Sequence, residues 1–420
     1  MAEESYVVRD RIPLSATSTA IEVSLERQDT YRIHVVPSAA AAEEVLLSEL
    51  DGRRAAVITE RTVASLPAYG LTETLKERGL LLGGMVLEPG ERSKSLGTAY
   101  ELIDWLAQIG LARRDVIVAL GGGMIMDTVG WVASAFMRGV PYVNVPTTLL
   151  AQVDAGIGGK VAVDHNAAKN LVGAFYQPRA VISCLEFLET LDPRQARAGL
   201  AEALKKAIIA SPELFEYIEA NADDLVRCHS PVVGPLVRAA STIKTELVSR
   251  DPYEIDLRRP LNFGHTIGHA VETTTGYGPV LHGEAVAFGM SVAVDISRAR
   301  GLLDPAIADR ILGLISRLGL PTRLEQLRSV PPVDDVLGAL DKIREIRDGS
   351  LRFVLPVELG TTLIAEDVTE AEVRDALLRS AAASTVNATD ADATDPDVDA
   401  TAASVTDTGA TSVDVTVAGR

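Results

Sequence analysis

Residues 115–127 read DVIVALGGGMIMD, and this stretch decides the fold. The apolar run at 116–120 predicts a buried strand, and glycines 121–123 separate it from a helical pattern that continues to residue 139. Glycines let a backbone approach a phosphate closely, and a helix N-terminus favours an anion. The spacing departs from G-x-G-x-x-G, so an ordinary tight strand–helix turn explains these glycines equally well.

The same alternation extends along the chain on both sides of this turn. Strands are predicted at 53–60, 80–91 and 141–148, and helices at 63–79 and 95–110. Strands that alternate with helices predict a parallel, doubly wound sheet. We therefore expect an α/β domain over residues 1–190.

The pattern changes after residue 190. Long helical patterns, of which 194–226 is the longest, predict a second, mostly α-helical domain over residues 191–380, with one late strand at 351–360. Residues 381–420 are a low-complexity mixture of Ala, Thr, Asp and Val without lysine. Such an acidic tail buries too little apolar surface to offset its ordering entropy, so we expect it to be disordered.

The composition limits the possible partners. The 420 residues carry a net charge of −18, which argues against binding to nucleic acid or an anionic membrane. Two distant cysteines, Cys184 and Cys228, form neither a disulfide framework nor a cysteine-based zinc site. The N-terminus lacks the features of a signal peptide, and no apolar run reaches membrane-spanning length. A cytoplasmic protein is expected.

Two further segments have the composition of a phosphate-binding site. In EPGERSK (88–94), Glu91 and Lys94 follow a Pro-Gly turn and could hold a ribose and a phosphate, although a solvated turn fits as well. Residues 145–173 begin with a strand and continue through glycines. Their polar side chains suit a phosphorylated ligand beyond a strand end, or else a surface loop: Thr147, Thr148, Asp154, Lys160, Lys169 and Asn170.

A third group contains three of the six histidines. In RRPLNFGHTIGHAVE (258–272), His265 and His269 lie four residues apart and share one helical face, as a metal pair or with two different roles. Glu202, His265 and His282 would make a three-ligand zinc site with one open position, whereas adding His269 would close it. Lys205 shares a helical face with Glu202.

Basic residues near these histidines suggest an anionic ligand. Arg138, Lys244 and Arg258 are either solvated charges or partners of a carboxylate or phosphate.

Together these motifs resemble the sugar phosphate cyclases, and most closely 3-dehydroquinate synthase. The resemblance covers roughly residues 50–365 and rests on GGGMIMD, VPTTLLAQVDAGIGGK, KNLVGAFYQP, GLAEALKKA, LNFGHTIGHA and LHGEAVAFGM. It implies a Rossmann-like NAD-binding N-terminal domain, a helical metal-binding C-terminal domain, and a homodimer.

The resemblance also implies roles for individual residues. NAD+ would contact Glu91, Lys94, Gly122, Gly123, Asp127, Thr147, Thr148, Lys160, Lys169 and Thr190. Zn2+ or Co2+ would be held by Glu202, His265 and His282. The substrate phosphate would meet Lys160, Asn170, Asn262 and His269, with Arg138 from the other subunit. Lys244 and Arg258 would bind a carboxylate, and Asp154 and Lys205 would lie near the oxidised hydroxyl.

The reaction implied by this resemblance converts 3-deoxy-D-arabino-heptulosonate 7-phosphate to 3-dehydroquinate, a step of the shikimate pathway and aromatic amino acid biosynthesis. A hydroxyl is oxidised transiently by NAD+, phosphate is eliminated, the hydride returns, and an aldol step closes the ring. We expect a carbon–oxygen lyase of this type, because buried cations at Lys244 and Arg258 would be costly without a substrate carboxylate.

Some residues depart from the dehydroquinate synthase pattern. Met126 and Val161 stand where that pattern has Gly and Thr, and Lys342 is followed by Ile343 instead of a second lysine. These departures resemble cyclases that convert sedoheptulose 7-phosphate into valiolone-type cyclitols, which makes such an enzyme the near alternative. The motifs also fit a 3-amino-dehydroquinate synthase, a metal-dependent polyol dehydrogenase, or a non-enzymatic binding protein with the same fold.

Overall fold

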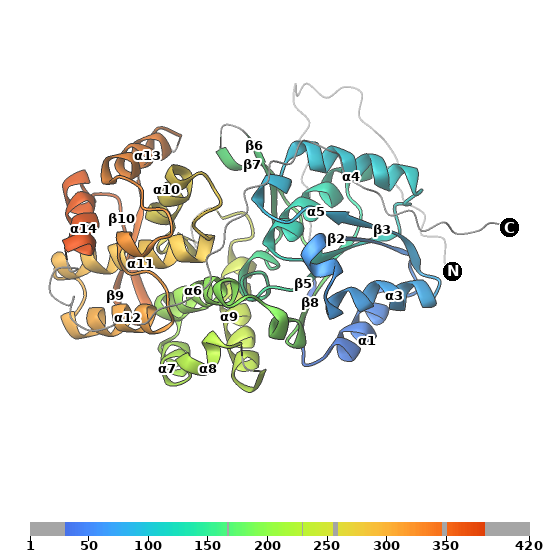
Figure 1. The fold of residues 1–420 in the computed structure, drawn as a ribbon, viewed down its shortest axis with the longest axis horizontal. Helices are drawn as coiled ribbons and strands as arrows, with labels where there is room; N and C mark the ends of the chain where they lie inside the picture. The colour runs from blue at the N-terminus through green and yellow to red at the C-terminus, as the bar shows by residue number, and fades with distance from the viewer. Residues whose placement is uncertain (1–29, 166–167, 229, 255–258, 347–350, 383–420) are drawn as a thin grey trace, which may run out of the picture. The chain divides into compact units, whose positions relative to one another are not determined.

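The computed structural model describes residues 30–165, 168–228, 230–254, 259–346 and 351–382 (Figure 1). Six parallel strands form its main sheet in the order β1-β8-β5-β4-β2-β3. They are β1 (Arg32–Val36), β2 (Ala55–Glu60), β3 (Leu81–Leu87), β4 (Val116–Gly121), β5 (Tyr142–Pro146) and β8 (Ala180–Cys184). The predicted parallel, doubly wound sheet is confirmed.

Helices cover both faces of this sheet, as the alternation of buried side chains along each strand requires. On β4, Val116 and Val118 pack towards α1 (Ala39–Leu50) and α3 (Gly70–Glu77). Ile117 and Ala119 point the other way, towards α4 (Leu96–Gln108) and α5 (Gly123–Ala135). Because β4 is apolar on both sides, it belongs to the centre of the sheet.

The glycine turn lies at the topological switch point. From β2 the chain moves outwards to β3, and it then returns to β4 and continues on the other side to β5. Open α/β sheets bind ligands outside the carboxyl ends of the strands at such a point. The Thr147 N–H donates to the Gly121 carbonyl over 2.9 Å, which ties the ends of β4 and β5 together.

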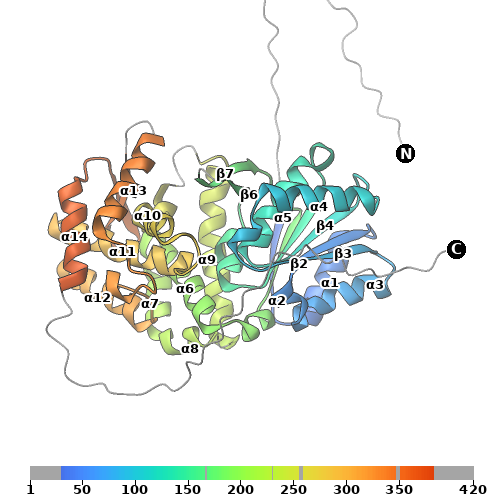
Figure 2. The same ribbon diagram turned by 45° about the horizontal axis from the view of Figure 1, so that its top comes forward.

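An antiparallel hairpin, which the sequence did not predict, occupies much of residues 147–175. It consists of β6 (Lys160–His165) and β7 (Ala168–Phe175), and a π-helix at Ala151–Ala155 precedes it. The hairpin lies on the side of the sheet that faces the helical half (Figure 2). It packs on α5 at Gly130, where an added Cβ would come within 2.3 Å of Val161 Cγ1. Only glycine permits this approach.

The second half is mostly helical, as predicted. Its helices are α6 (Pro193–Ala210), α7 (Pro212–Ala220), α8 (Ala222–Val226), α9 (Ser230–Arg250), α10 (His265–Thr275), α11 (His282–Ala299), α12 (Pro305–Arg317), α13 (Val333–Ile346) and α14 (Glu370–Ala382). The helices α6 and α11 are buried around most of their circumference. The charged side chains on α6 are therefore unusual, since buried charges require partners.

Short helical segments connect these elements. They are α2 (Arg61–Ala64) and the 3₁₀ turns Pro67–Tyr69, Glu91–Ser93, Phe136–Arg138, Glu186–Thr190, Arg259–Asn262 and Leu324–Gln326. None of the described helices is both long and apolar enough to cross a membrane.

Several predicted elements are divided in the structure. The helix predicted at 63–79 is broken at Pro67, and the pattern at 194–226 is broken at Pro212, because proline lacks the N–H that an uninterrupted helix needs. The late strand is one arm of a hairpin, β9 (Phe353–Glu358) with β10 (Thr361–Ala365). Of the tail that was predicted to be disordered, residues 381 and 382 are the last two of α14, and residues 383–420 lie outside the described part of the chain.

Candidate active site

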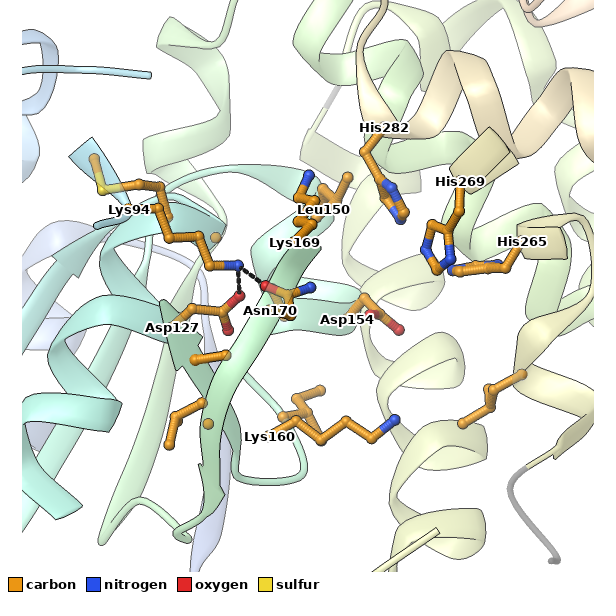
Figure 3. Close-up of a pocket in the computed structure, with 18 of the residues that line it drawn as sticks. Lys94, Asp127, Leu150, Asp154, Lys160, Lys169, Asn170, His265, His269 and His282 are labelled. Carbon is orange, nitrogen blue, oxygen red and sulfur yellow. Dashed lines mark hydrogen bonds and ion pairs between the residues drawn. The ribbon is translucent and has the colours of Figure 1, made fainter. Parts of the chain in front are cut away.

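A cavity of about 720 Å³ lies between the sheet half and the helical half (Figure 3). Most of the candidate residues line it: Glu91, Lys94, Gly123, Asp127, Asp154, Lys160, Lys169, Asn170, Lys205, Lys244, Asn262, His265, His269 and His282. Motifs that are up to 191 residues apart in the sequence, from Glu91 to His282, therefore meet in one site.

A buried polar cluster lies on the sheet side of the cavity. The Lys94 ammonium donates to Asp127 over 2.5 Å and also to the Asn170 side-chain oxygen (Figure 3). Burial raises the pKa of Asp127, and the neighbouring Lys94 opposes that shift. Asn170 has a φ of +56°, and its N–H donates to Asp164. The cluster is therefore held in place before any ligand binds.

Three predicted metal ligands converge on the helical side. Glu202 is on α6, and His265 and His282 are the first residues of α10 and α11. The Glu202 Oε1 atom lies 3.6 Å from His265 Nε2 and 3.7 Å from His282 Nε2. Gly264, whose φ of +78° is accessible mainly to glycine, lets α10 begin at His265.

The donor atoms of this group suit a divalent metal. The Nδ1 of His265 is 3.1 Å from the Phe263 carbonyl, and the Nδ1 of His282 is 3.1 Å from Glu272 Oε2. Both partners only accept hydrogen bonds, so each Nδ1 carries a proton, and in the neutral ring Nε2 is the atom that offers a lone pair. The buried Glu202 Oε1 has no hydrogen-bond donor among the described residues. Three such ligands leave a position for substrate.

Electrostatics favour the same group. Burial holds the pKa of His265 well below its usual value, and Lys205 and the neighbouring histidines add to the effect, so its ring is neutral. A second group, His269, Glu272 and His282, also has its donor atoms within 4.8 Å. Both oxygens of the Glu272 carboxylate are already engaged, by His282 and Lys169, whereas Glu202 Oε1 has no hydrogen-bond donor among the described residues and lies near the Nε2 atoms of His265 and His282. The geometry favours the group with Glu202.

His269 lies beside this group without completing it. Its ring is 5.2 Å from that of His265 and 6.0 Å from that of His282, measured between centroids. The helical spacing of His265 and His269 is confirmed. The helix α10 begins after Gly264, and Asn262 belongs to the preceding 3₁₀ turn Arg259–Asn262. Arg258 lies outside the described residues.

A network of buried charges separates the two sides. Asp154 projects from the π-helix, a feature often found at functional sites. Its Oδ1 is 2.8 Å from Lys206 Nζ, and its Oδ2 is 3.0 Å from Lys244 Nζ. Burial alone would raise the pKa of Asp154, but the surrounding lysines hold it well below its usual value. Asp154 is therefore a carboxylate at all physiological pH values.

Lys244 is compensated within the protein. Its ammonium donates to the Asp154 carbonyl over 2.7 Å and also pairs with the Asp154 carboxylate. Burial lowers the pKa of Lys244 to about 8, and the repulsion of Lys206 contributes, against the attraction of Asp154. Asp154 supplies an opposite charge to Lys244 but shares it with Lys206, so the role of Lys244 towards a substrate carboxylate stays a prediction.

Two further residues of the site were missed by the sequence reasoning. Lys206 is fully buried and contacts both Asp154 and Glu202. Glu272 is buried and pairs with His282 and Lys169. The signals were two consecutive lysines in the alanine- and leucine-rich second half of a helix, and an acid seven residues after His265 on the same helix.

Some predicted residues do not line the cavity. Gly122, Thr147 and Thr148 lie at the glycine turn, where an added Cβ on Gly122 would be 3.2 Å from Thr148 Cγ2. Thr190 donates to the Phe187 carbonyl within a 3₁₀ turn. Arg138 has a φ of +67° in the segment after α5, and its role towards another subunit stays a prediction. Lys342 is exposed on α13.

Comparison with known proteins identifies relatives over most of the chain. Residues 84–198 match the family model for the N-terminal part of 3-dehydroquinate synthase, and residues 199–341 match the model for its C-terminal part. A 2-epi-valiolone synthase from Actinosynnema mirum is 69% identical over 374 residues, which are 89% of this chain and 98% of that protein. A 3-dehydroquinate synthase from Desulforamulus reducens is 39% identical over 84% of this chain and 98% of that protein.

A solved structure has the same fold. The 2-epi-5-epi-valiolone synthase of Streptomyces hygroscopicus subsp. jinggangensis 5008, with NAD+ and Zn2+ bound, is 32% identical and has a TM-score of 0.80. The match covers 86% of this chain and 99% of that chain.

Proposed function

The chain belongs to the sugar phosphate cyclase family of 3-dehydroquinate synthase, and from this premise we propose that it converts sedoheptulose 7-phosphate into 2-epi-valiolone, releasing phosphate. The observation that carries the proposal is the 69% identity to a 2-epi-valiolone synthase, against 39% to a 3-dehydroquinate synthase. The internal pairing of Lys244 with Asp154 is consistent with it, because Lys244 has an opposite charge within the protein when the sugar carries no carboxylate.

The proposed cofactors are NAD+ and a divalent metal, Zn2+. Glu202, His265 and His282 would hold the metal, and the polar cluster of Lys94, Asp127 and Asn170 belongs to the dinucleotide side. When bound, the dinucleotide accepts and returns one hydride, and the metal polarises substrate oxygen atoms. The remaining predicted NAD+ contacts, from Glu91 to Thr190, are retained in this proposal.

The residues of the chain position the sugar and its charges. Three buried lysines, Lys205, Lys206 and Lys244, face two carboxylates, Glu202 and Asp154, so the network carries one net positive charge (three minus two). That excess stabilises the oxygen anion that forms when the sugar hydroxyl loses its proton. Asp154 and Lys205 orient this hydroxyl in the proposal.

The phosphate of the substrate would lie at the hairpin. Lys160, Asn170, Asn262 and His269 line the same cavity and offer hydrogen-bond donors. The proposal includes a homodimer, in which Arg138 of the second copy reaches this phosphate. It also includes the domain limits 1–190 and 191–380. Phosphate leaves by elimination, the hydride returns to the sugar, and the opened sugar closes by an aldol step.

A second candidate is 3-dehydroquinate synthesis, because both family models describe that enzyme. The test supplies each heptulose phosphate separately with NAD+ and Zn2+ and measures phosphate release and NADH absorbance. We expect phosphate release from sedoheptulose 7-phosphate with no net NADH. Release from 3-deoxy-D-arabino-heptulosonate 7-phosphate alone would establish the second candidate, and net NADH without phosphate would indicate a polyol dehydrogenase.

A further inference from the structure

Glu272 on α10 is buried at the edge of the metal site and has a separate partner for each carboxylate oxygen. Its Oε2 is 3.1 Å from His282 Nδ1, and its Oε1 is 3.2 Å from Lys169 Nζ. The contact of Oε2 with Nδ1 fixes the His282 imidazole so that its Nε2 faces Glu202. The contact of Oε1 connects the same carboxylate to Lys169 of the hairpin.

Lys169 comes from β7 of the hairpin, on the sheet side of the cavity (Figure 3). Its ammonium is shared between Glu272 and Glu91, whose Oε1 lies 2.8 Å away. It also lies 5.5 Å from the centre of the Tyr277 ring. A continuous series of contacts therefore runs from Glu91 through Lys169 and Glu272 to His282.

We propose that Glu272 is a positioning residue that couples metal binding to dinucleotide binding through Lys169. A cation at His282 Nε2 makes the Nδ1–H a stronger donor, which draws the charge of Glu272 towards His282. Lys169 is then held less strongly by Glu272 and is available to an anionic group such as a pyrophosphate. The two ligands should therefore bind with positive cooperativity. The inference rests on the cofactors of the proposed function and not on its substrate.

The hairpin supplies a matched control. Lys160 on β6 pairs with Glu254, which precedes α10 in the helical half. This ion pair also crosses the cavity, and it does not involve a proposed metal ligand. Glu254→Gln therefore makes the same chemical change as Glu272→Gln, in a more exposed ion pair across the cavity, without affecting His282.

The experiment measures the Zn2+ dissociation constant by chelator competition, with and without saturating NAD+, and no sugar phosphate is present. We expect NAD+ to tighten Zn2+ binding by about fivefold or more in the wild type, and Zn2+ to tighten NAD+ binding equally. Glu272→Gln should weaken Zn2+ binding about 10–100-fold and abolish the cooperativity. Glu254→Gln should keep the wild-type cooperativity.

Lys169→Met separates orientation from coupling. It leaves the contact of Glu272 with His282, so Zn2+ affinity without NAD+ should stay close to that of the wild type while the cooperativity is lost. If circular dichroism shows that Glu272→Gln does not fold, the Lys169→Met variant alone tests the coupling. Independent binding in the wild type, or wild-type cooperativity in Lys169→Met, would overturn the inference. A wild type that binds neither Zn2+ nor NAD+ would overturn the proposed cofactors as well.

Discussion

At the scale of single residues, the electrostatics of the site depend on how each buried charge is compensated. Lys244 has its partner in Asp154, so its presence says little about a carboxylate on the substrate. Asp154 in turn is shared between Lys244 and Lys206, which fixes both of its oxygens. Because the three buried lysines share two carboxylates, this network acts on the reaction through position and field.

Lys244 should give the reaction an alkaline limit. Its pKa of about 8 means that its charge is lost as the pH rises through that value, and kcat/KM should fall with it. Lys244→Met should lower kcat/KM at pH 7 by about 100–1,000-fold, in the range of one lost charge-stabilising group, and should remove the limb near pH 8. A limb that persists unchanged in Lys244→Met would contradict this assignment.

Lys206 should stabilise the fold mainly through Asp154. Removing one partner of a buried ion pair leaves the other uncompensated, so Lys206→Met should lower the free energy of unfolding by about 3 kcal/mol. In an Asp154→Asn background the same substitution should cost much less, which a double-mutant cycle in urea would measure. Additive effects would contradict the pairing. Lys342→Met, at an exposed position on α13, is the control and should change little.

The sequence predicted some of these residues and not others. The metal ligands Glu202, His265 and His282 could be predicted because each lies in a recognisable motif, and the structure brings them together. Lys206 and Glu272 were missed because their roles depend on partners from other elements, Asp154 for Lys206 and Lys169 for Glu272. Whether a lysine in a helix faces solvent or a buried carboxylate is decided by packing, which a single sequence does not contain.

At the scale of elements, the hairpin β6–β7 organises the site. It carries Lys160, Lys169 and Asn170 from the sheet half to the helical half. Sequence patterning failed here because the segment is rich in glycine and polar residues, which resemble a loop. The strand, glycine turn and helix at 116–135 were predicted well, because a buried parallel strand is continuously apolar.

The contact of α5 with the hairpin depends on Gly130. An added Cβ would be 2.3 Å from Val161 Cγ1, so Gly130→Ala should destabilise the protein by about 1–3 kcal/mol in urea unfolding. Val161→Ala in the same chain should recover part of the loss. Gly313→Ala is the matched control: this glycine lies within α12 with open space around it, so the change should stabilise slightly. Equal effects at both glycines would contradict the packing.

At the scale of the whole molecule, the site exists only where the two halves meet. The sheet half supplies the glycine turn, Lys94 and Asp127, and the helical half supplies Glu202 and the histidines. The alternation of strands and helices predicted both halves, but not the hairpin contacts that join them. Which substrate the site selects depends on all the residues that line the cavity, so no single motif determines the substrate.

The most direct test of the central claim is a competition between the two sugars in one reaction. Sedoheptulose 7-phosphate and 3-deoxy-D-arabino-heptulosonate 7-phosphate are supplied at equal concentration with NAD+ and Zn2+, and mass spectrometry quantifies both cyclic products. The ratio of products gives the ratio of kcat/KM values. We predict a preference of about 100-fold or more for the sugar without a carboxylate. Preferential formation of 3-dehydroquinate would contradict the account.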